Sequence, residues 1–333
     1  MSPIDRTREL AHALAAVRTA SSVCRSVQQN LVTAARLEKK DKSPVTVADF
    51  ASQALVCAAL AEHSAVTAIV GEEDAADLRK AGADQMRQQV VAQVRRIRGT
   101  DVSEEQALAW IDLGGVTPDS STPTFWTLDP VDGTKGFLRG EQYAVALGLL
   151  EDGTVTVGVL GCPNLPGPDG RQGALLAAIR GEGAWILPLD GENLSERKAI
   201  HVANVSETAG ARFCESVESG HSDHDLSSQI AAKLGITAEP VRVDSQAKYA
   251  ILAQGLASVY LRLPTRKDYR EKIWDHAAGS IVVQEAGGRV TDVMGAALDF
   301  SRGRTLEDNR GIVATSGAIH DDVIAVVGEF VEL

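Results

Sequence analysis

The chain has 333 residues, enough for about two domains, and 44% of them are hydrophobic, as is ordinary for a globular protein. Its formal net charge of −12 argues against nucleic-acid polymers and anionic membranes as partners, because phosphate surfaces attract proteins with a basic face. A small phosphorylated ligand is still compatible with this charge, since it needs only a local positive site.

The cysteines and the apolar runs indicate the compartment. Four cysteines, Cys24, Cys57, Cys162 and Cys214, are far apart and form no CxxC pair, which favours a reduced compartment with cysteines in the core. The first residues contain no apolar signal core, and no apolar run approaches transmembrane length. We therefore expect a soluble cytoplasmic protein that contacts no membrane, while organellar targeting stays open.

The first half of the chain begins with helical patterns. Apolar residues at helical spacing predict a helix over residues 4–37 and a second amphipathic stretch over 51–62, which Asp49 opens. An apolar strand at 66–70 then leads into an acidic cluster, and a helix is expected at 75–98.

A loop at 112–124, rich in Gly, Ser, Thr, Pro and Asp, separates these helices from a run of strands. Short turns between β-rich runs predict two hairpins, and a Pro/Gly loop is expected between them at 162–173. The predicted strands cover 125–128, 143–150, 154–160, 174–179 and 184–187. The first half is therefore expected to combine helices with an antiparallel sheet.

From Thr208 onward strands and helices alternate, which predicts an α/β layer. Strands are expected at 212–217, 241–243, 258–263, 289–291 and 312–314, and helices at 225–234, 245–254, 275–286 and 318–330. We therefore predict an α/β protein with two parts, an α+β part over residues 1–205 and an α/β part over residues 206–333.

The most informative stretch reads Asp129-Pro130-Val131-Asp132-Gly133-Thr134. Pro130 biases Asp129 toward an extended backbone, and Gly133 lets the chain turn tightly, so a strand can run directly into a loop. Two carboxylates three residues apart can then face one point, where a cation would relieve their repulsion. An ordinary acidic surface turn explains the same residues, and the stretch alone does not decide between the two.

Further acids lie at the ends of other predicted elements: Asp49, Glu72 and Asp275. Asp49 and Asp275 could instead cap their helices, and Glu72 could belong to an acidic first turn. A set of oxygen donors without paired His or Cys suits Mg²⁺ or Mn²⁺ rather than zinc or iron. Two or more such ions can activate a water and stabilise a leaving alkoxide in phosphate-ester hydrolysis.

Two other motifs with closely spaced acids match less well. A calcium-binding EF-hand that began at Asp129 would need oxygen ligands at Val131 and Gly133 and a Glu in place of Gly140, so it is rejected. Haloacid-dehalogenase phosphatases use Asp-x-Asp-Gly-Thr with a nucleophilic first Asp, whereas here two residues separate the acids. This type is kept as a competitor in which Asp129 would become phosphorylated.

Three signatures in the chain resemble those of the lithium-sensitive inositol monophosphatase superfamily. They are Gly71-Glu72-Glu73, the Asp129 stretch, and Trp274-Asp275-His276-Ala277-Ala278-Gly279 followed by Glu285-Ala286-Gly287-Gly288. They occur in the right order, cover most of the chain and are far more specific together than singly. Within the superfamily the chain is most similar to the phosphatases of 3′(2′),5′-bisphosphate nucleotides. The stretches that carry this similarity are 134–144, 161–165, 217–222, 244–249 and 260–264.

The resemblance implies a layered αβαβα sandwich of the inositol monophosphatase and fructose-1,6-bisphosphatase type, with the site between its two halves. It implies two or three Mg²⁺ ions, which Mn²⁺ could replace, held by Glu72, Asp129, the Val131 carbonyl, Asp132 and Asp275. Asp49 would lie beside a metal-bound water, and Thr134 with Glu72 would assist its attack. The residues that would bind the nucleotide are Gly133, Thr134, His221, Ser245, Lys248 and Arg262.

The activity that the resemblance implies is removal of the 3′-phosphate of adenosine 3′,5′-bisphosphate, a by-product of sulfur assimilation, giving AMP and phosphate. Water would attack directly, without a phosphoenzyme, and lithium and sodium would inhibit. Three alternatives stay open: action on 3′-phosphoadenylyl sulfate, a preference for inositol phosphates, and a catalytically silent nucleotide sensor. We expect a monomer whose partner is a small phosphorylated nucleotide, not a nucleic-acid polymer or a membrane.

Overall fold

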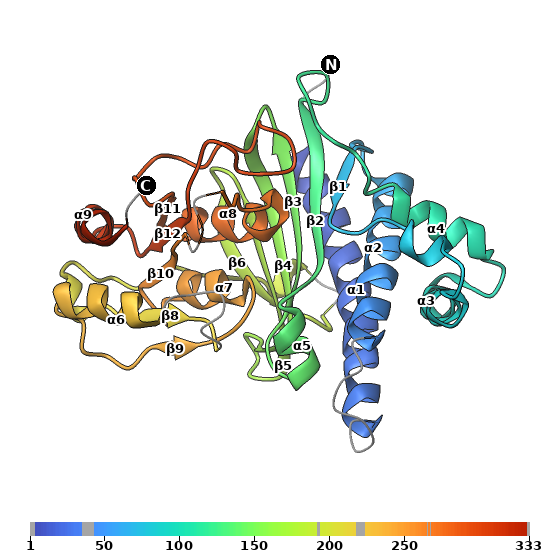
Figure 1. The fold of residues 1–333 in the computed structure, drawn as a ribbon, viewed down its shortest axis with the longest axis horizontal. Coiled ribbons are helices and arrows are strands. Elements are labelled where there is room, and N and C mark those ends of the chain that lie inside the picture. The colour runs from blue at the N-terminus through green and yellow to red at the C-terminus, as the bar shows by residue number, and fades with distance from the viewer. Residues whose placement is uncertain are drawn as a thin grey trace.

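Two β-sheets alternate with three layers of helices through the molecule (Figure 1). The structure is a computed structural model that describes residues 4–34, 43–191, 194–217, 224–264, 266 and 268–331. Among these residues no helix is both long and apolar enough to cross a membrane.

The helical layer on one side consists of α1 (Arg6–Ala34) and α2 (Ser43–His63), which pack against each other and against the larger sheet. The buried apolar side chains of α1 recur at helical spacing, which explains why one face of this helix enters the core. Two further helices, α3 (Asp84–Arg98) and α4 (Glu104–Asp112), pack against α2 from outside (Figure 1).

Within the described residues, the larger sheet contains seven strands in the order of the chain. They are β1 (Ile69–Gly71), β2 (Thr124–Asp132), β3 (Ala144–Glu151), β4 (Thr154–Pro166), β5 (Gln172–Ile179), β6 (Gly183–Pro188) and β7 (Lys198–Ala199). β1 runs parallel to β2, and every later pair is antiparallel, so both predicted hairpins are confirmed.

A central helical layer lies between the two sheets and contacts both of them. It consists of α7 (Ala247–Ala253) and α8 (Ala277–Glu285), with the short helix η5 (Ile273–Asp275) leading into α8. α8 comes close to the larger sheet because Gly158 lacks a side chain: a Cβ there would lie 2.4 Å from Cγ2 of Ile281. The short helix η5 consequently contacts β2 as well.

The smaller sheet has the strand order β11-β12-β10-β8-β9. Its strands are β8 (Phe213–Glu215), β9 (Val241–Arg242), β10 (Val259–Arg262), β11 (Arg289–Thr291) and β12 (Ile312–Thr315). Two helices, α6 (His224–Lys233) and α9 (His320–Phe330), form the last layer (Figure 1). The layered αβαβα sandwich is therefore confirmed. The boundary at residue 205 lies between β7 and β8 and stays a prediction.

One helical expectation in the first half is wrong, and one helix was missed. The helix expected at 75–98 is interrupted: a single turn, η1 (Asp77–Arg79), precedes α3, and Gly82 between them has a φ of +89°, outside the helical region. The helix α4 was not predicted, although Ser103 accepts a hydrogen bond from the N–H of Gln106, a capping pattern that the sequence contains.

The acidic positions also differ from their expected local structure. Asp49 lies inside α2 and Asp275 ends η5, so neither residue caps the helix that it was expected to open. β2 continues through Asp132, and a short helix, α5 (Thr134–Arg139), follows where a loop was expected. The first residues of the loop expected at 162–173 belong to β4.

Candidate active site

One cavity of about 420 Å³ collects most of the predicted site residues from both halves of the chain. Its walls come from the ends of β1, β2 and β10, the starts of α5 and α7, and η5. The predicted residues that line it are Glu72, Asp129, Val131, Asp132, Gly133, Thr134, Ser245, Lys248, Arg262 and Asp275.

A bulge in β2 directs two acids into this cavity. Side chains alternate along a regular strand, so residues three apart would point to opposite faces. In β2, however, Asp129 pairs with Ala146 and Asp132 with Ala144, so three residue steps on β2 match two on β3. Both carboxylates consequently line the cavity, while the side chain of Val131 packs in the core.

The carboxylates of the cluster repel one another. Asp129 is only 2% exposed, and its Oδ1 has no hydrogen-bond partner among the described residues. Burial and the charges of Glu72, Asp132 and Asp275 raise the pKa of Asp129 well above its usual value. Burial also raises the pKa of Glu72, although its side chain shares a hydrogen bond with Asp129.

Asp275 joins this cluster from the other half of the chain. Burial, followed by the charge of Asp132, raises the pKa of Asp275, while the guanidinium of Arg262 acts in the opposite direction. Such a group of buried carboxylates is stable in ionised form only beside cations. The orphaned oxygen of Asp129 and the all-oxygen donor set fit Mg²⁺ or a similar hard cation.

Asp49 lies behind the cluster and does not line the cavity. Its carboxylate is close enough to raise the pKa of Asp129. The pKa of Asp49 itself is raised well above its usual value by burial and by the charges of Glu73 and Glu72. A carboxyl group with a raised pKa can accept a proton near neutral pH.

Two cations from the second half reach the same cavity. Lys248 is 6% exposed, and its Nζ lies 5.3 Å from the centre of the Tyr260 ring. Burial lowers the pKa of Lys248, and the charge of Asp132 opposes this shift. The Nε of Arg262 lies 2.7 Å from Oε2 of Glu271, an ion pair that orients the guanidinium at the cavity wall.

Ser245 and Gly133 meet where α5 and α7 begin. A Cβ on Gly133 would lie 2.7 Å from Cβ of Ser245, and Gly133 has a φ of +93°. Ser245 also has a positive φ, of 68°, and its Oγ accepts a hydrogen bond from the N–H of Ala247. The cavity wall is therefore narrow here, and only glycine fits at position 133.

A second polar cluster beside the cavity is an ion-pair chain. Ligand atoms of Glu271, Asp275 and His276 lie within 4.8 Å of one another. Oε2 of Glu271 already pairs with Arg262 and with Nε2 of His276, and Nδ1 of His276 lies 2.8 Å from the hydroxyl of Tyr249. Because these contacts satisfy Glu271 and His276, we assign them to positioning rather than to metal binding.

The cavity wall also contains residues that were not predicted from the sequence. Asp244, Gln246, Tyr260, Tyr269 and Ser216 line the cavity. Asp244, Gln246 and Tyr260 belong to the stretches 244–249 and 260–264, which already carry the family resemblance. They could have been predicted because they lie next to predicted site residues in the chain. His221, predicted to bind the nucleotide, lies outside the described residues.

A family model described as the inositol monophosphatase family matches residues 5–332. Among curated relatives, a 3′(2′),5′-bisphosphate nucleotidase of Emericella nidulans is 46% identical over 320 residues, covering 89% of this chain and 91% of the relative. A relative of the same name from Oryza sativa is 45% identical over 343 residues, covering 97% of this chain and 94% of the relative.

Solved structures share the fold. An inositol monophosphatase from Anabaena superposes with a TM-score of 0.63 at 20% identity, covering 100% of this chain and 99% of that one. SuhB of Mycobacterium tuberculosis superposes with a TM-score of 0.61 at 19% identity, covering 99% and 98%. At this identity the likeness supports the fold and not the substrate.

Proposed function

The chain belongs to the inositol monophosphatase family, and from this premise we propose that it removes the 3′-phosphate of adenosine 3′,5′-bisphosphate, giving AMP and phosphate. The observation that carries the proposal is a single cavity lined by a carboxylate cluster and by cationic side chains, among them Lys248 and Arg262 from the second half and Lys135 from the first. A substrate with two phosphates needs both features, since one phosphate must react and the other must be held. The names of the curated relatives support the same substrate.

The carboxylate cluster is proposed to hold Mg²⁺, two or three ions, for which Mn²⁺ could substitute. The proposed ligands are Glu72, Asp129, the Val131 carbonyl, Asp132 and Asp275. When bound, such ions supply Lewis-acid activation of water and stabilise the charge that develops on the leaving oxygen.

The protein residues around the cluster have separate proposed roles. Thr134 and Glu72 would orient the attacking water, since both line the cavity. Asp49, behind them, would accept a proton at its carboxylate, in keeping with its raised pKa. The reaction would then proceed by direct attack of water, and no protein group would carry the phosphate.

The second half is proposed to bind the nucleotide. Lys248 and Arg262 would pair with the 5′-phosphate, because a buried ammonium and a fixed guanidinium suit phosphate oxygens. Gly133, Thr134 and Ser245 would form the wall against which the substrate lies. His221 is kept as a proposed contact on the basis of the resemblance alone.

Several finer points belong to the same proposal. We infer action on 3′-phosphoadenylyl sulfate as well, inhibition by lithium and sodium, a monomeric enzyme and a cytoplasmic location. The haloacid-dehalogenase mechanism is not proposed further, because the chain belongs to a different family.

A substrate panel tests the proposal. Initial rates would be measured with Mg²⁺ for adenosine 3′,5′-bisphosphate, 3′-phosphoadenylyl sulfate, 3′-AMP and inositol 1-phosphate. We expect the highest kcat/KM for adenosine 3′,5′-bisphosphate and 3′-phosphoadenylyl sulfate, which carry phosphate groups at both the 3′ and the 5′ position. Equal turnover of inositol 1-phosphate would sink the nucleotide assignment and favour the inositol phosphate alternative.

A further inference from the structure

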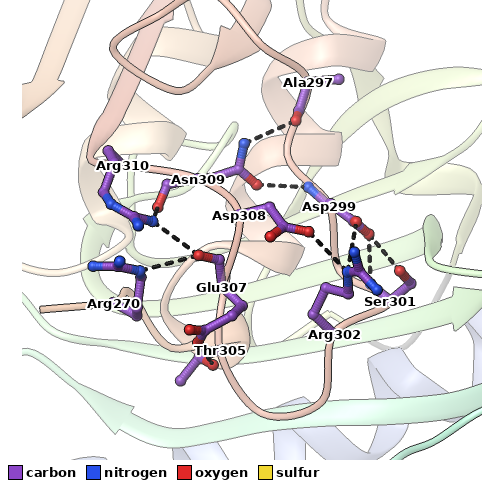
Figure 2. Close-up of polar contacts among 10 residues, drawn as sticks. All are labelled: Arg270, Ala297, Asp299, Ser301, Arg302, Thr305, Glu307, Asp308, Asn309 and Arg310. Atoms are coloured by element: carbon purple, nitrogen blue, oxygen red, sulfur yellow. Dashed lines mark hydrogen bonds and ion pairs between the residues drawn. The ribbon is translucent and has the colours of Figure 1, made fainter. Parts of the chain in front are cut away.

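The loop between β11 and β12, residues 292–311, is held in shape by its own polar contacts (Figure 2). Asp299 accepts hydrogen bonds from the N–H and the hydroxyl of Ser301, at 2.9 and 2.6 Å. Asn309 accepts a 2.8 Å hydrogen bond from the N–H of Asp299, and Arg302 pairs with Asp308 at 2.8 Å. The loop therefore gives a fixed base to any side chain that it carries.

Arg304, in this loop, contacts the segment that leads to Asp275. Its main-chain carbonyl accepts a hydrogen bond from the N–H of Ile273 at 3.2 Å. Its guanidinium carbon lies 4.7 Å from the centre of the Trp274 ring, a stacking contact of the cation–π type. Because Trp274 directly precedes Asp275, Arg304 restrains one acid of the cluster through its neighbours in the chain.

The same guanidinium also reaches the first half of the chain. It donates hydrogen bonds to the carbonyls of Gly71, the last residue of β1, and of Val116, the latter at 3.0 Å. Glu72 follows Gly71 directly, and its N–H donates to the carbonyl of Leu128 on the opposite side, at 3.2 Å. Glu72 is thus fixed between β2 and Arg304.

We propose that Arg304 is a positioning residue that holds Glu72 and Asp275 at the separation that a divalent cation requires. The proposal rests on the proposed function in taking these two acids as metal ligands. It goes beyond that function because Arg304 is not among the residues that line the cavity. Within the described part of the chain, its guanidinium forms no ion pair with the carboxylate of Glu72 or of Asp275. One planar guanidinium spans both carbonyls and the indole, which an ammonium on a single stem cannot do.

If Arg304 acted only through its charge, its removal would change the metal affinity in the opposite direction. Arg304 is a cation near an acidic cluster, so its removal leaves the cluster more negative and would tighten the binding of a divalent cation. Loss of positioning weakens binding instead, because the ligands must be ordered when the ion binds. The direction of the change therefore separates the two roles.

Metal binding by the purified full chain tests the proposal without turnover. Mn²⁺ binding would be followed by electron paramagnetic resonance and Mg²⁺ binding by calorimetry, for Arg304→Met, Arg304→Lys and the wild type. We expect both variants to raise the dissociation constant about 10-fold, since partners outside the ligand shell commonly contribute this much. At saturating Mg²⁺ the KM for the nucleotide should stay near the wild-type value, because Lys248 and Arg262 are intact.

Arg302→Met is the matched control. Arg302 lies in the same loop and pairs with Asp299 and Asp308, so its loss changes the loop's charge without freeing Gly71 or Trp274. Its metal affinity should equal that of the wild type. Thermal unfolding without metal would confirm that all four proteins are folded at the temperature used.

The outcomes separate this proposal from the proposed function. Unchanged or tighter metal binding in Arg304→Met overturns the positioning role, as does full restoration by Arg304→Lys. A wild-type chain that binds no divalent cation overturns it as well. If metal binding depends on Arg304 while adenosine 3′,5′-bisphosphate is not hydrolysed, the positioning role stands and the substrate assignment fails.

Discussion

The main-chain N–H of Gln246 donates a 2.5 Å hydrogen bond to Oδ2 of Asp132. Asp132 ends β2 in the first half of the chain, and Gln246 precedes α7 in the second. The contact therefore connects the carboxylate cluster to the segment that carries Ser245 and Lys248. The two proposed tasks, metal binding and nucleotide binding, share this point.

Asp129→Asn should make the metal-free protein more stable while abolishing its response to Mg²⁺. The pKa of Asp129 is higher in the folded than in the unfolded protein. The free energy of unfolding of the wild type therefore decreases as pH rises above the pKa of this group in the unfolded chain. At neutral pH the variant should gain about 1 kcal/mol, and the difference should vanish below about pH 4. Urea unfolding with and without Mg²⁺ measures both effects. A variant that Mg²⁺ still stabilises like the wild type would remove Asp129 from the metal site.

The Lys248→Met variant should lose the preference for a substrate with a 5′-phosphate in addition to the 3′-phosphate. A buried ammonium bound to phosphate contributes about 2 kcal/mol, so kcat/KM for adenosine 3′,5′-bisphosphate should fall about 30-fold. The value for 3′-AMP, which lacks the 5′-phosphate, should change little. Lys233→Met is a suitable control, since Lys233 pairs with Glu329 on the outer helical layer. Equal losses on both substrates would place Lys248 elsewhere in the mechanism.

Gly133→Ala should destabilise the protein by about 1–3 kcal/mol, because alanine strains a positive φ and its Cβ would meet Ser245. The displaced Ser245 should also raise the KM for the nucleotide. Gly170→Ala separates backbone strain from the clash with Ser245. Gly170 also has a positive φ, of +79°, but no neighbouring atom lies within 4 Å of the place that an alanine methyl group would take. If Gly170→Ala costs as much stability, the contact with Ser245 contributes nothing.

Buried His320 should make the fold sensitive to mild acid, independently of the active site. The ring lies between the hydroxyls of Thr291 and Thr315, at 2.9 Å from each, and burial lowers its pKa to about 4. A lowered histidine pKa means that the unfolded chain binds the proton first, so stability falls as pH decreases from about 6.5 toward 4.

His320→Gln removes this titration while keeping a polar side chain. Its free energy of unfolding should be lower than that of the wild type at about pH 7 but should decline less between pH 6.5 and 4. Urea unfolding across this range gives both slopes. Parallel slopes would show that His320 does not cause the acid sensitivity.

The sequence identified the acids of the cluster because each lies at the end of a patterned element. Glu72 follows an apolar strand, and Asp129 directly follows the strand predicted at 125–128, where Pro130 keeps the backbone extended. The bulge that turns both Asp129 and Asp132 inward was not predictable, because it depends on the pairing of β2 with β3. Local pattern carries no information on that register.

The contacts between the two halves of the chain could also not be predicted from the sequence. Arg304 lies in a polar loop where a charged residue is ordinarily solvated, and nothing local indicates that it reaches Gly71. Similarly, Asp244 was not chosen, although it lies in the cavity wall and forms an ion pair with Arg139 of the first half. Such contacts follow from packing between elements far apart in the chain.

The most direct test is phosphate release from adenosine 3′,5′-bisphosphate by the purified chain, with Mg²⁺ and after chelation, with ³¹P spectra of the products. The account predicts that release requires Mg²⁺ and that the nucleotide product keeps its 5′-phosphate. Release that continues unchanged after chelation, or loss of the 5′-phosphate in place of the 3′-phosphate, would contradict it.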